Sequence, residues 1–224
     1  MQTKVPRAGA IIMKLSHVKM LSNSRSLFSN PNYKAAKKGC PFSARALVST
    51  LAITFQEFRF FTGFVCPVMK PQGNRIPQAM AEHIVAASDS IFYDSILLMN
   101  QRSGSTMGAR ILYTPDFNGP VLPGNYILVD DFFTTGTTLI YLKRHIENHG
   151  GNVVNAVVLS CSAYGHNFEP SKWLLETLIM KFPNISEYFD LDTLCDGHIR
   201  HLLKYSSLQS FYNRYCIETS LLFQ

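Results

Sequence analysis

The sequence has no long apolar run and no paired-cysteine motif. Its longest apolar stretches, residues 46–55 and 60–69, are shorter than the roughly 18 residues that cross a bilayer, so no transmembrane helix is predicted. The five cysteines are odd in number and include no Cys-x-x-Cys pair, which excludes a zinc ribbon or a thioredoxin-type site. Nothing calls for an oxidising compartment or indicates a signal peptide, and we expect a cytoplasmic protein.

Acidic residues are missing from the first quarter of the chain. The 224 residues include 21 Lys and Arg against 15 Asp and Glu, a formal net charge of +6. Nine of the basic residues precede Glu57, the first acid, so the remainder of the chain is slightly acidic. A basic segment can contact nucleic acid. Because the rest of the chain does not share this charge, an extended nucleic-acid surface is disfavoured and a nucleic-acid partner stays open for the N-terminal segment alone.

Short apolar stretches alternate with amphipathic ones in the middle of the chain. Strands are predicted over residues 61–69, 91–99, 126–129 and 153–159, helices from Pro77 and over 137–149, and a long polar loop over 100–110. This alternation predicts an α/β fold, an open, mainly parallel sheet flanked by helices. In such sheets, ligands bind beyond the carboxyl ends of the strands.

The composition divides the chain into four segments. We expect a basic, flexible segment over 1–28, a helical N-terminal extension over 29–59, the α/β core over 60–165 and a helical C-terminal region packed on the core over 166–224. In the C-terminal region, Trp173, Leu174, Leu178 and Ile179 are expected to form one packing face of a helix.

Most of the chemistry lies in residues 126–139. An apolar strand leads to Asp130 and Asp131, and then to a small-residue loop that ends in a helix. The loop consists of Thr134, Thr135, Gly136, Thr137 and Thr138. Its hydroxyls and N–H groups at a helix N-terminus suit a phosphate. Carboxylates suit hydroxyl groups, or a metal reached through water. A ligand with a phosphate at one end and vicinal hydroxyls at the other is a ribose 5-phosphate.

This segment resembles the 5-phosphoribosyl 1-pyrophosphate (PRPP) binding motif of type I phosphoribosyltransferases. The resemblance extends over roughly residues 60–159, and the wider chain, including 30–39, is similar to uncharacterised bacterial proteins built on this domain. It implies the type I phosphoribosyltransferase fold. It also implies that Asp130 and Asp131 contact the ribose hydroxyls and that residues 134–138 hold the 5-phosphate. A strand-end turn with solvated acids is the alternative interpretation.

The resemblance assigns two further loops. Lys70, Gly73, Asn74 and Arg75 would form the pyrophosphate loop, and residues 100–110 would form the mobile hood that closes over the substrate. The hood carries Arg102 and Arg110 but lacks the lysine found in the orotate group, so Arg102 is the preferred substitute and, with Asp130 and Asp131, the catalytic candidate. Solvent-exposed charges on ordinary loops are the alternative.

These assignments predict a Mg²⁺-dependent transferase that moves the phosphoribosyl group of PRPP to a nitrogenous base and releases pyrophosphate. Mg²⁺ would bind mainly through PRPP, with Asp130 and Asp131 as further ligands through water. Thr134 stands where hypoxanthine/guanine-type members place an aspartate, which disfavours a 6-oxopurine acceptor. A regulatory protein that binds PRPP without catalysis is the alternative, and a homodimer is left open. The His145/His149 pair has metal-ligand spacing but no third ligand, so a metal hydrolase is disfavoured.

Overall fold

The centre of the fold is a five-stranded parallel sheet. The computed structural model describes residues 19–20, 24–51, 55–70, 73–100, 106–161 and 168–220, with the backbone alone for 19–20, 24–26 and 216–220. Its strands are β1 (Lys19–Met20), β2 (Phe64–Pro67), β3 (Ile91–Phe92), β4 (Leu97–Leu98), β5 (Phe117–Asn118), β6 (Gly124–Phe133) and β7 (Gly151–Cys161). The sheet has the order β1-β7-β6-β2-β3 with parallel pairing throughout, while β4 and β5 form a separate antiparallel pair.

Helices precede, connect and follow the strands. They are α1 (Ser24–Ser29), α2 (Pro31–Lys37), α3 (Pro41–Ser49), α5 (Ile76–Ala86), α6 (Met107–Leu112), α7 (Thr137–Asn148), α8 (Lys172–Lys181), α9 (Asp196–Leu202) and α10 (Leu208–Ser220). Short 3₁₀ helices cover Gln56–Phe58, Ile185–Glu187 and Leu191–Thr193. The predicted α/β class, a parallel sheet flanked by helices with further helices towards both ends of the chain, is confirmed.

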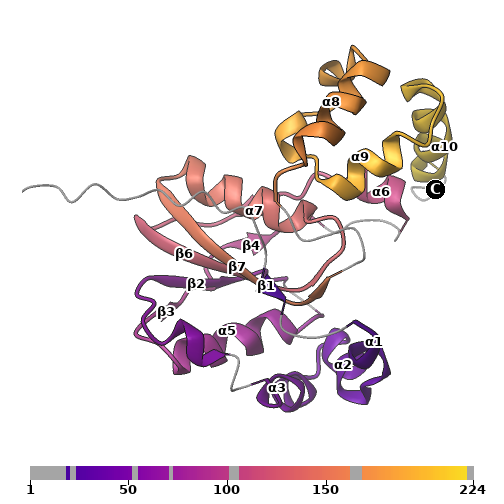
Figure 1. Cartoon of the computed structure of the whole chain (residues 1–224). Coiled ribbons are helices and arrows are strands. Elements are labelled where there is room, and N and C mark those ends of the chain that lie inside the picture. Colours follow the sequence, from indigo (N-terminus) through magenta and orange to yellow (C-terminus); the bar gives the residue numbers. More distant parts are fainter. Residues whose placement is uncertain are drawn as a thin grey trace, which may run out of the picture.

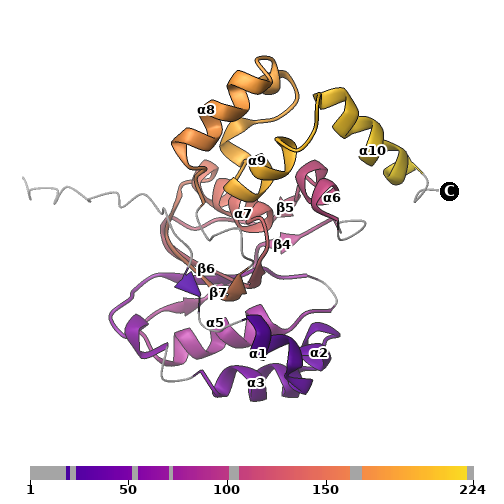
Figure 2. The same ribbon diagram turned by 45° about the vertical axis from the view of Figure 1, so that its right-hand side comes forward.

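Each face of the sheet has its own apolar core. Helices α1, α2, α3 and α5 lie against one face, and α7 lies against the other, with α6 and α8–α10 beyond it (Figures 1 and 2). The alternation of side chains along β6 supplies both cores: Leu128 joins the core under α7, and Ile127 and Val129 join the core under α5. A strand covered on both faces must be apolar throughout, which explains the unbroken run before the acids.

The carboxyl end of β6 is where the sheet opens. Pairing between β2 and β6 ends at Pro67 opposite Val129, whereas β7 accompanies β6 as far as Phe133. The strand is therefore longer than the predicted span 126–129, because the pairing with β7 continues through both acids. Asp130 and Asp131 lie just beyond the last residue of β6 that pairs with β2, so one side of the strand is open at this point.

The predicted strand over 91–99 is divided into two. Ile91 and Phe92 pair with β2 in the main sheet, whereas Leu97 and Leu98 pair with β5 in the separate ribbon. The prediction of one continuous strand is wrong because Asp94 and Ser95 lie between the two pairings. The ribbon leads directly towards the stretch expected to form the hood.

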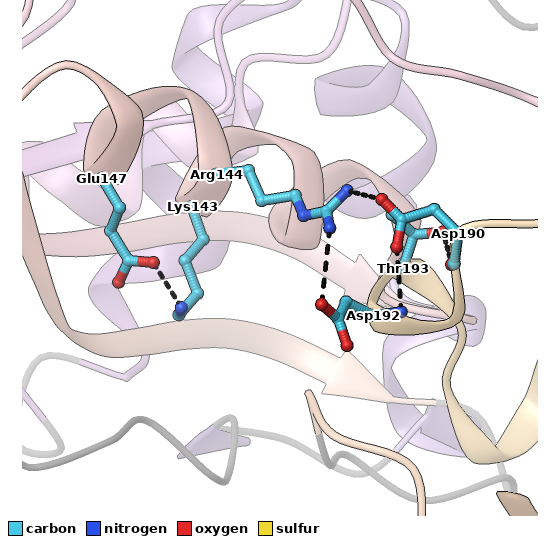
Figure 3. A network of polar contacts seen from close by, with 6 residues as sticks. All are labelled: Lys143, Arg144, Glu147, Asp190, Asp192 and Thr193. Atoms are coloured by element: carbon cyan, nitrogen blue, oxygen red, sulfur yellow. Dashed lines mark hydrogen bonds and ion pairs between the residues drawn. The ribbon is translucent and has the colours of Figure 1, made fainter.

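The C-terminal helices form a third apolar core together with α6, and charged side chains link them to α7. Figure 3 shows the guanidinium of Arg144 on α7 between the carboxylates of Asp190 and Asp192, at 2.7 and 3.9 Å. Beside it Lys143 pairs with Glu147 along the helix. The bond to Asp190 raises the pKa of Arg144 and lowers that of Asp190. These contacts hold the segment between α8 and α9 against the core.

The expected packing face of α8 is half right. Leu174 and Leu178, one helical turn apart, are buried, but Trp173 and Ile179 are 56% and 40% exposed. The prediction for Trp173 is wrong because a position next to Leu174 is rotated about 100° around the helix. Its ring lies on the surface, 5.4 Å from the guanidinium carbon of Arg200.

The division at residue 28 falls inside α1, whose Leu27 is buried in the core beneath the sheet. The four-segment division otherwise stays a prediction. No helix among the residues that the structure describes is long and apolar enough to cross a membrane.

Candidate functional site

The small-residue loop forms a tight turn into a helix N-terminus. Gly136 caps α7 with φ +75°, a left-handed conformation that favours glycine, and a Cβ at this position would lie 2.4 Å from the Phe133 ring. The first turn of α7 carries no acid, so its positive dipole end is not neutralised from within the helix. A small hollow of about 30 Å³ lies against this turn and is lined by Asp130, Arg110 and residues 134–139, among others. The loop therefore has the form expected of a phosphate cradle.

Asp130 faces this hollow. Its Oδ1 accepts the amide N–H of Asp131 at 2.8 Å. Removal from water raises the pKa of Asp130 to about 7, and the negative charge of Asp131 acts in the same direction. The amide of Asp131 and the charges of Lys37 and Lys70 oppose the shift. Asp130 therefore ionises only near neutral pH, and a ligand or an added positive charge would favour its ionised form.

Asp131 is turned towards the N-terminal extension instead. Its Oδ2 lies 2.5 Å from Lys37 Nζ and accepts a longer hydrogen bond of 3.4 Å from the Tyr33 hydroxyl. Burial, followed by the charge of Asp131, raises the pKa of Tyr33. The side chain of Asp131 is only 7% exposed, whereas that of Lys37 is 40% exposed. The two adjacent acids thus have different surroundings: Lys37 neutralises Asp131, and Asp130 remains at the hollow.

One larger cavity joins these groups. It has a volume of about 630 Å³ and is lined by Phe28, Tyr33, Lys37, Val68, Lys70, Gly73, Asn74, Leu98, Arg110, Tyr113, Asp130, Asp131, Phe132, Thr134 and Thr138. The two spaces adjoin, because they share the lining residues Arg110, Tyr113, Asp130, Phe132, Thr134 and Thr138. The cavity is large enough for a sugar phosphate together with a second small molecule.

The structure brings most of the expected pyrophosphate loop to this cavity. Lys70, Gly73 and Asn74 line it, and Asn74 Oδ1 also accepts the Ile76 amide at 3.2 Å at the start of α5. Arg75 lies elsewhere. Its guanidinium donates to Gln78 Oε1 at 3.2 Å, and its side chain lines a separate shallow hollow beside Glu82.

The expected hood is described in part. Arg110 on α6 lines both the hollow and the cavity, and its role as a hood cation stays a prediction. Arg102 lies outside the described residues, so its place in the site stays a prediction. Tyr113 also lines the cavity, and its hydroxyl is held by the carbonyl and side chain of Asn100 at 3.1 Å.

Sequence reasoning missed an aromatic wall in which Phe28 of α1 and Phe132 of β6 line the cavity, backed by Tyr33 of α2. The rings of Phe28 and Phe132 lie 5.4 Å apart, and that of Tyr33 packs edge-on against Phe28 at 5.6 Å. Phe28 is 49% exposed, and its ring is available to a ligand in the cavity. The spacing of Tyr33 and Lys37, four residues apart on one helix, could have indicated a shared face but not what it meets.

Sequence reasoning also missed His198. Its Nε2 lies 3.0 Å from Thr137 Oγ1, and this hydroxyl is 3.0 Å from Thr135 Oγ1. His198 belongs to α9, so a residue of the C-terminal region contacts the loop of residues 134–138.

The donors at the cavity suit a magnesium ion that arrives with its ligand. Among the residues that the structure describes, no group of three His, Cys, Asp or Glu side chains could hold a metal ion by itself. The carboxylate of Asp130, however, offers a hard oxygen ligand at the cavity, and a Mg²⁺ ion carried by phosphates needs only one or two such ligands from the protein.

Comparison with known proteins identifies one curated relative. Over 148 residues, the chain is 32% identical to the Escherichia coli protein called Protein TraN. The match covers 60% of this chain and 33% of that protein, so the chain spans about a third of the relative's length. No protein-family model matches.

Two solved structures share features of the chain path. The orotate phosphoribosyltransferase of Aeropyrum pernix matches with 18% identity and a TM-score of 0.33, over 64% of this chain and 67% of that one. The purine phosphoribosyltransferase of Pyrococcus horikoshii Ot3 matches with 13% identity and a TM-score of 0.30, over 53% and 82%. At these values the likeness concerns the fold and leaves substrate and activity open.

Proposed function

We propose that the protein binds PRPP and, with Mg²⁺, transfers its phosphoribosyl group to a nitrogenous base, releasing pyrophosphate. The observation that carries the proposal is the cavity in which a glycine-capped helix N-terminus, a carboxylate and two basic side chains meet. Asp130 and Arg110 line the small hollow together with the loop of residues 134–138, and both also line the larger cavity, where Lys70 lies as well. The loop suits a 5-phosphate, Asp130 suits vicinal hydroxyls, and Lys70 and Arg110 suit a diphosphate.

The chain's residues would act by positioning and by charge. The N–H groups and hydroxyls of residues 134–138 hold the 5-phosphate, and Asp130 accepts hydrogen bonds from the ribose hydroxyls. Lys70 and Arg110 stabilise the negative charge that develops on the departing diphosphate. Because this charge is larger in the transition state than in the bound substrate, fixed cations at this position lower the barrier. When bound, Mg²⁺ would neutralise the diphosphate oxygens, held by PRPP and, through water, by Asp130.

The aromatic wall is the natural place for the acceptor. The rings of Phe28 and Phe132 face the same cavity as the acids, and a planar base can stack on them. The wall comes from α1 and from β6, directly beyond the acids, so a base stacked there would approach the ribose held by Asp130.

A regulatory protein that binds PRPP without catalysis is the second candidate. Two observations favour it. The first is that nine basic residues precede the first acid in the sequence. The second is that Lys37 forms an ion pair with Asp131, one of the two acids expected to hold the ribose. A sensor needs the phosphate loop but no acceptor site.

Pyrophosphate release across a panel of nucleobases tests enzyme against sensor. The proposal predicts Mg²⁺-dependent release with at least one base, lost in Asp130→Asn. Tight PRPP binding with no release from any base would favour the sensor. Absence of PRPP binding would overturn both candidates.

A further inference from the structure

His198 joins the C-terminal helical region to the phosphate loop. His198 is only 2% exposed. It does not line the hollow or the cavity, and neither does any other described residue of the C-terminal region. Its contact is the side-chain hydroxyl of Thr137, the first residue of α7, which in turn contacts the hydroxyl of Thr135. A buried polar side chain thus ends a short chain of hydroxyls that line the hollow.

The contacts of the ring determine where its proton lies. The amide N–H of Cys195 donates to Nδ1 at 3.3 Å, so Nδ1 is the nitrogen without a proton. Burial, with the charges of His201 and Arg110, lowers the pKa of His198 to about 3, and the ring is neutral at physiological pH. A neutral ring that accepts at Nδ1 carries its proton on Nε2 and points it at Thr137. The backbone of Thr193 acts in the opposite direction and favours the charged ring.

We propose that His198 is a positioning residue for the phosphate loop, acting as a hydrogen-bond donor to the Thr137 hydroxyl. This inference rests on the proposed function of the loop. Because Thr137 receives the ring's proton, it does not donate its own hydrogen to the ring. The hydroxyls of Thr137 and Thr135 carry two hydrogens between them, and one of these is used in the hydrogen bond between the two hydroxyls. Whichever hydroxyl donates that bond, the hydrogen of the other remains for a phosphate oxygen.

The direction of the proton matters because a phosphate dianion only accepts hydrogen bonds. If the ring instead accepted from Thr137, that hydroxyl would turn a lone pair towards the ligand and the loop would lose a donor. A residue from the C-terminal region would then decide how many donors the loop offers, without touching the ligand.

Paired substitutions test this role. Gln can place an amide N–H near the position of Nε2, whereas Asn can replace the Nδ1 acceptor but is too short to reach Thr137. Calorimetry with Mg²⁺ and PRPP should show binding about tenfold weaker in His198→Asn, with recovery in His198→Gln. His149→Gln, at an exposed histidine, is the matched control and should bind as the wild type does. Equal weakening in the Asn and Gln variants would contradict the proposal.

A double-mutant cycle separates positioning from general support of the fold. Thr137→Val removes the hydroxyl that His198 is proposed to act through. His198→Asn should therefore add less than about twofold to the loss of PRPP affinity in that background, whereas independent effects would multiply. Multiplied losses would overturn the inference.

The ring's tautomer can be read without any ligand. Nitrogen-15 NMR of the imidazoles should show a neutral His198 protonated at Nε2, and protonation at Nδ1 would overturn the inference by itself. If the wild-type protein binds no PRPP, the proposed function fails, while the tautomer still tests the donor assignment independently.

Discussion

Replacing Asp130 by Asn should stabilise the folded protein at neutral pH while removing its function. Asn keeps the shape of the side chain but carries no charge to bury. The pKa of Asp130 is raised from 3.8 to about 7. At 1.36 kcal/mol per unit, this corresponds to an upper limit of about 4 kcal/mol of folding free energy lost on ionisation. Because the side chain keeps some contact with solvent, we expect about half of that to be recovered by Asp130→Asn at pH 8.

The sign of the pH dependence follows from the raised pKa. Between pH 4 and 7 the folded protein holds a proton on Asp130 that the unfolded chain has released. The contribution of Asp130 to stability is therefore complete below pH 4, is lost as the pH rises towards 7, and stays lost above it. Asp130→Asn removes this loss. The free energy of unfolding of the variant should therefore exceed that of the wild type by an amount that grows from near zero at pH 4 to its full value near pH 8.

Urea denaturation of both proteins at pH 5, 6, 7 and 8 measures this difference. Subtracting the two curves cancels the seven histidines, which titrate in the same range. Asp116→Asn, at an exposed carboxylate, is the control and should show no growing advantage. A difference between wild type and Asp130→Asn that is flat or shrinks with rising pH would refute the argument that Asp130 is ionised at a cost.

Three further substitutions probe the wall and the loop. Gly136→Ala forces an L-residue into a left-handed conformation against the Phe133 ring, so unfolding should become easier by about 1–2 kcal/mol and PRPP affinity should fall; an unchanged melting temperature would contradict this. Lys37→Met leaves Asp131 buried without its cation, and we expect a loss of about 1–2 kcal/mol in denaturation, against no change in Lys38→Met. Phe28→Ala should raise the acceptor KM several-fold and leave the Kd of PRPP unchanged; equal losses for both ligands would remove the wall from the acceptor site.

The sequence was sufficient for the parts of the fold that depend on local patterns. The apolar run before Asp130 predicted a buried strand, and the amphipathic stretch between Gly136 and the Gly150-Gly151 pair predicted α7. The division of residues 91–99 between two sheets was missed because pairing partners are not visible in a local run. The exposure of Trp173 was missed because an apolar residue beside a helical stripe looks like part of it.

The site was predictable where chain neighbours build it and not where distant segments meet. The loop of residues 134–138 and both acids lie within nine residues, so chain connectivity alone keeps them close, and Asp130 lines the same hollow as the loop. The ion pair of Lys37 with Asp131 spans 94 positions, and the contact of His198 with Thr137 spans 61. Nothing in one sequence indicates such pairs. Arg75 shows the converse: its neighbours Lys70, Gly73 and Asn74 line the cavity, but its own side chain is turned to Gln78 in the following turn.

Calorimetric titration of PRPP with Mg²⁺ into the wild-type protein and Asp130→Asn tests the central claim most directly. The proposed site predicts one binding event per chain in the wild type and none in Asp130→Asn. Because Asp130→Asn is expected to be at least as stable as the wild type at pH 8, its loss of binding cannot be attributed to unfolding. Absence of binding in the wild type, or equal affinity in both proteins, would contradict the assignment of this cavity to PRPP.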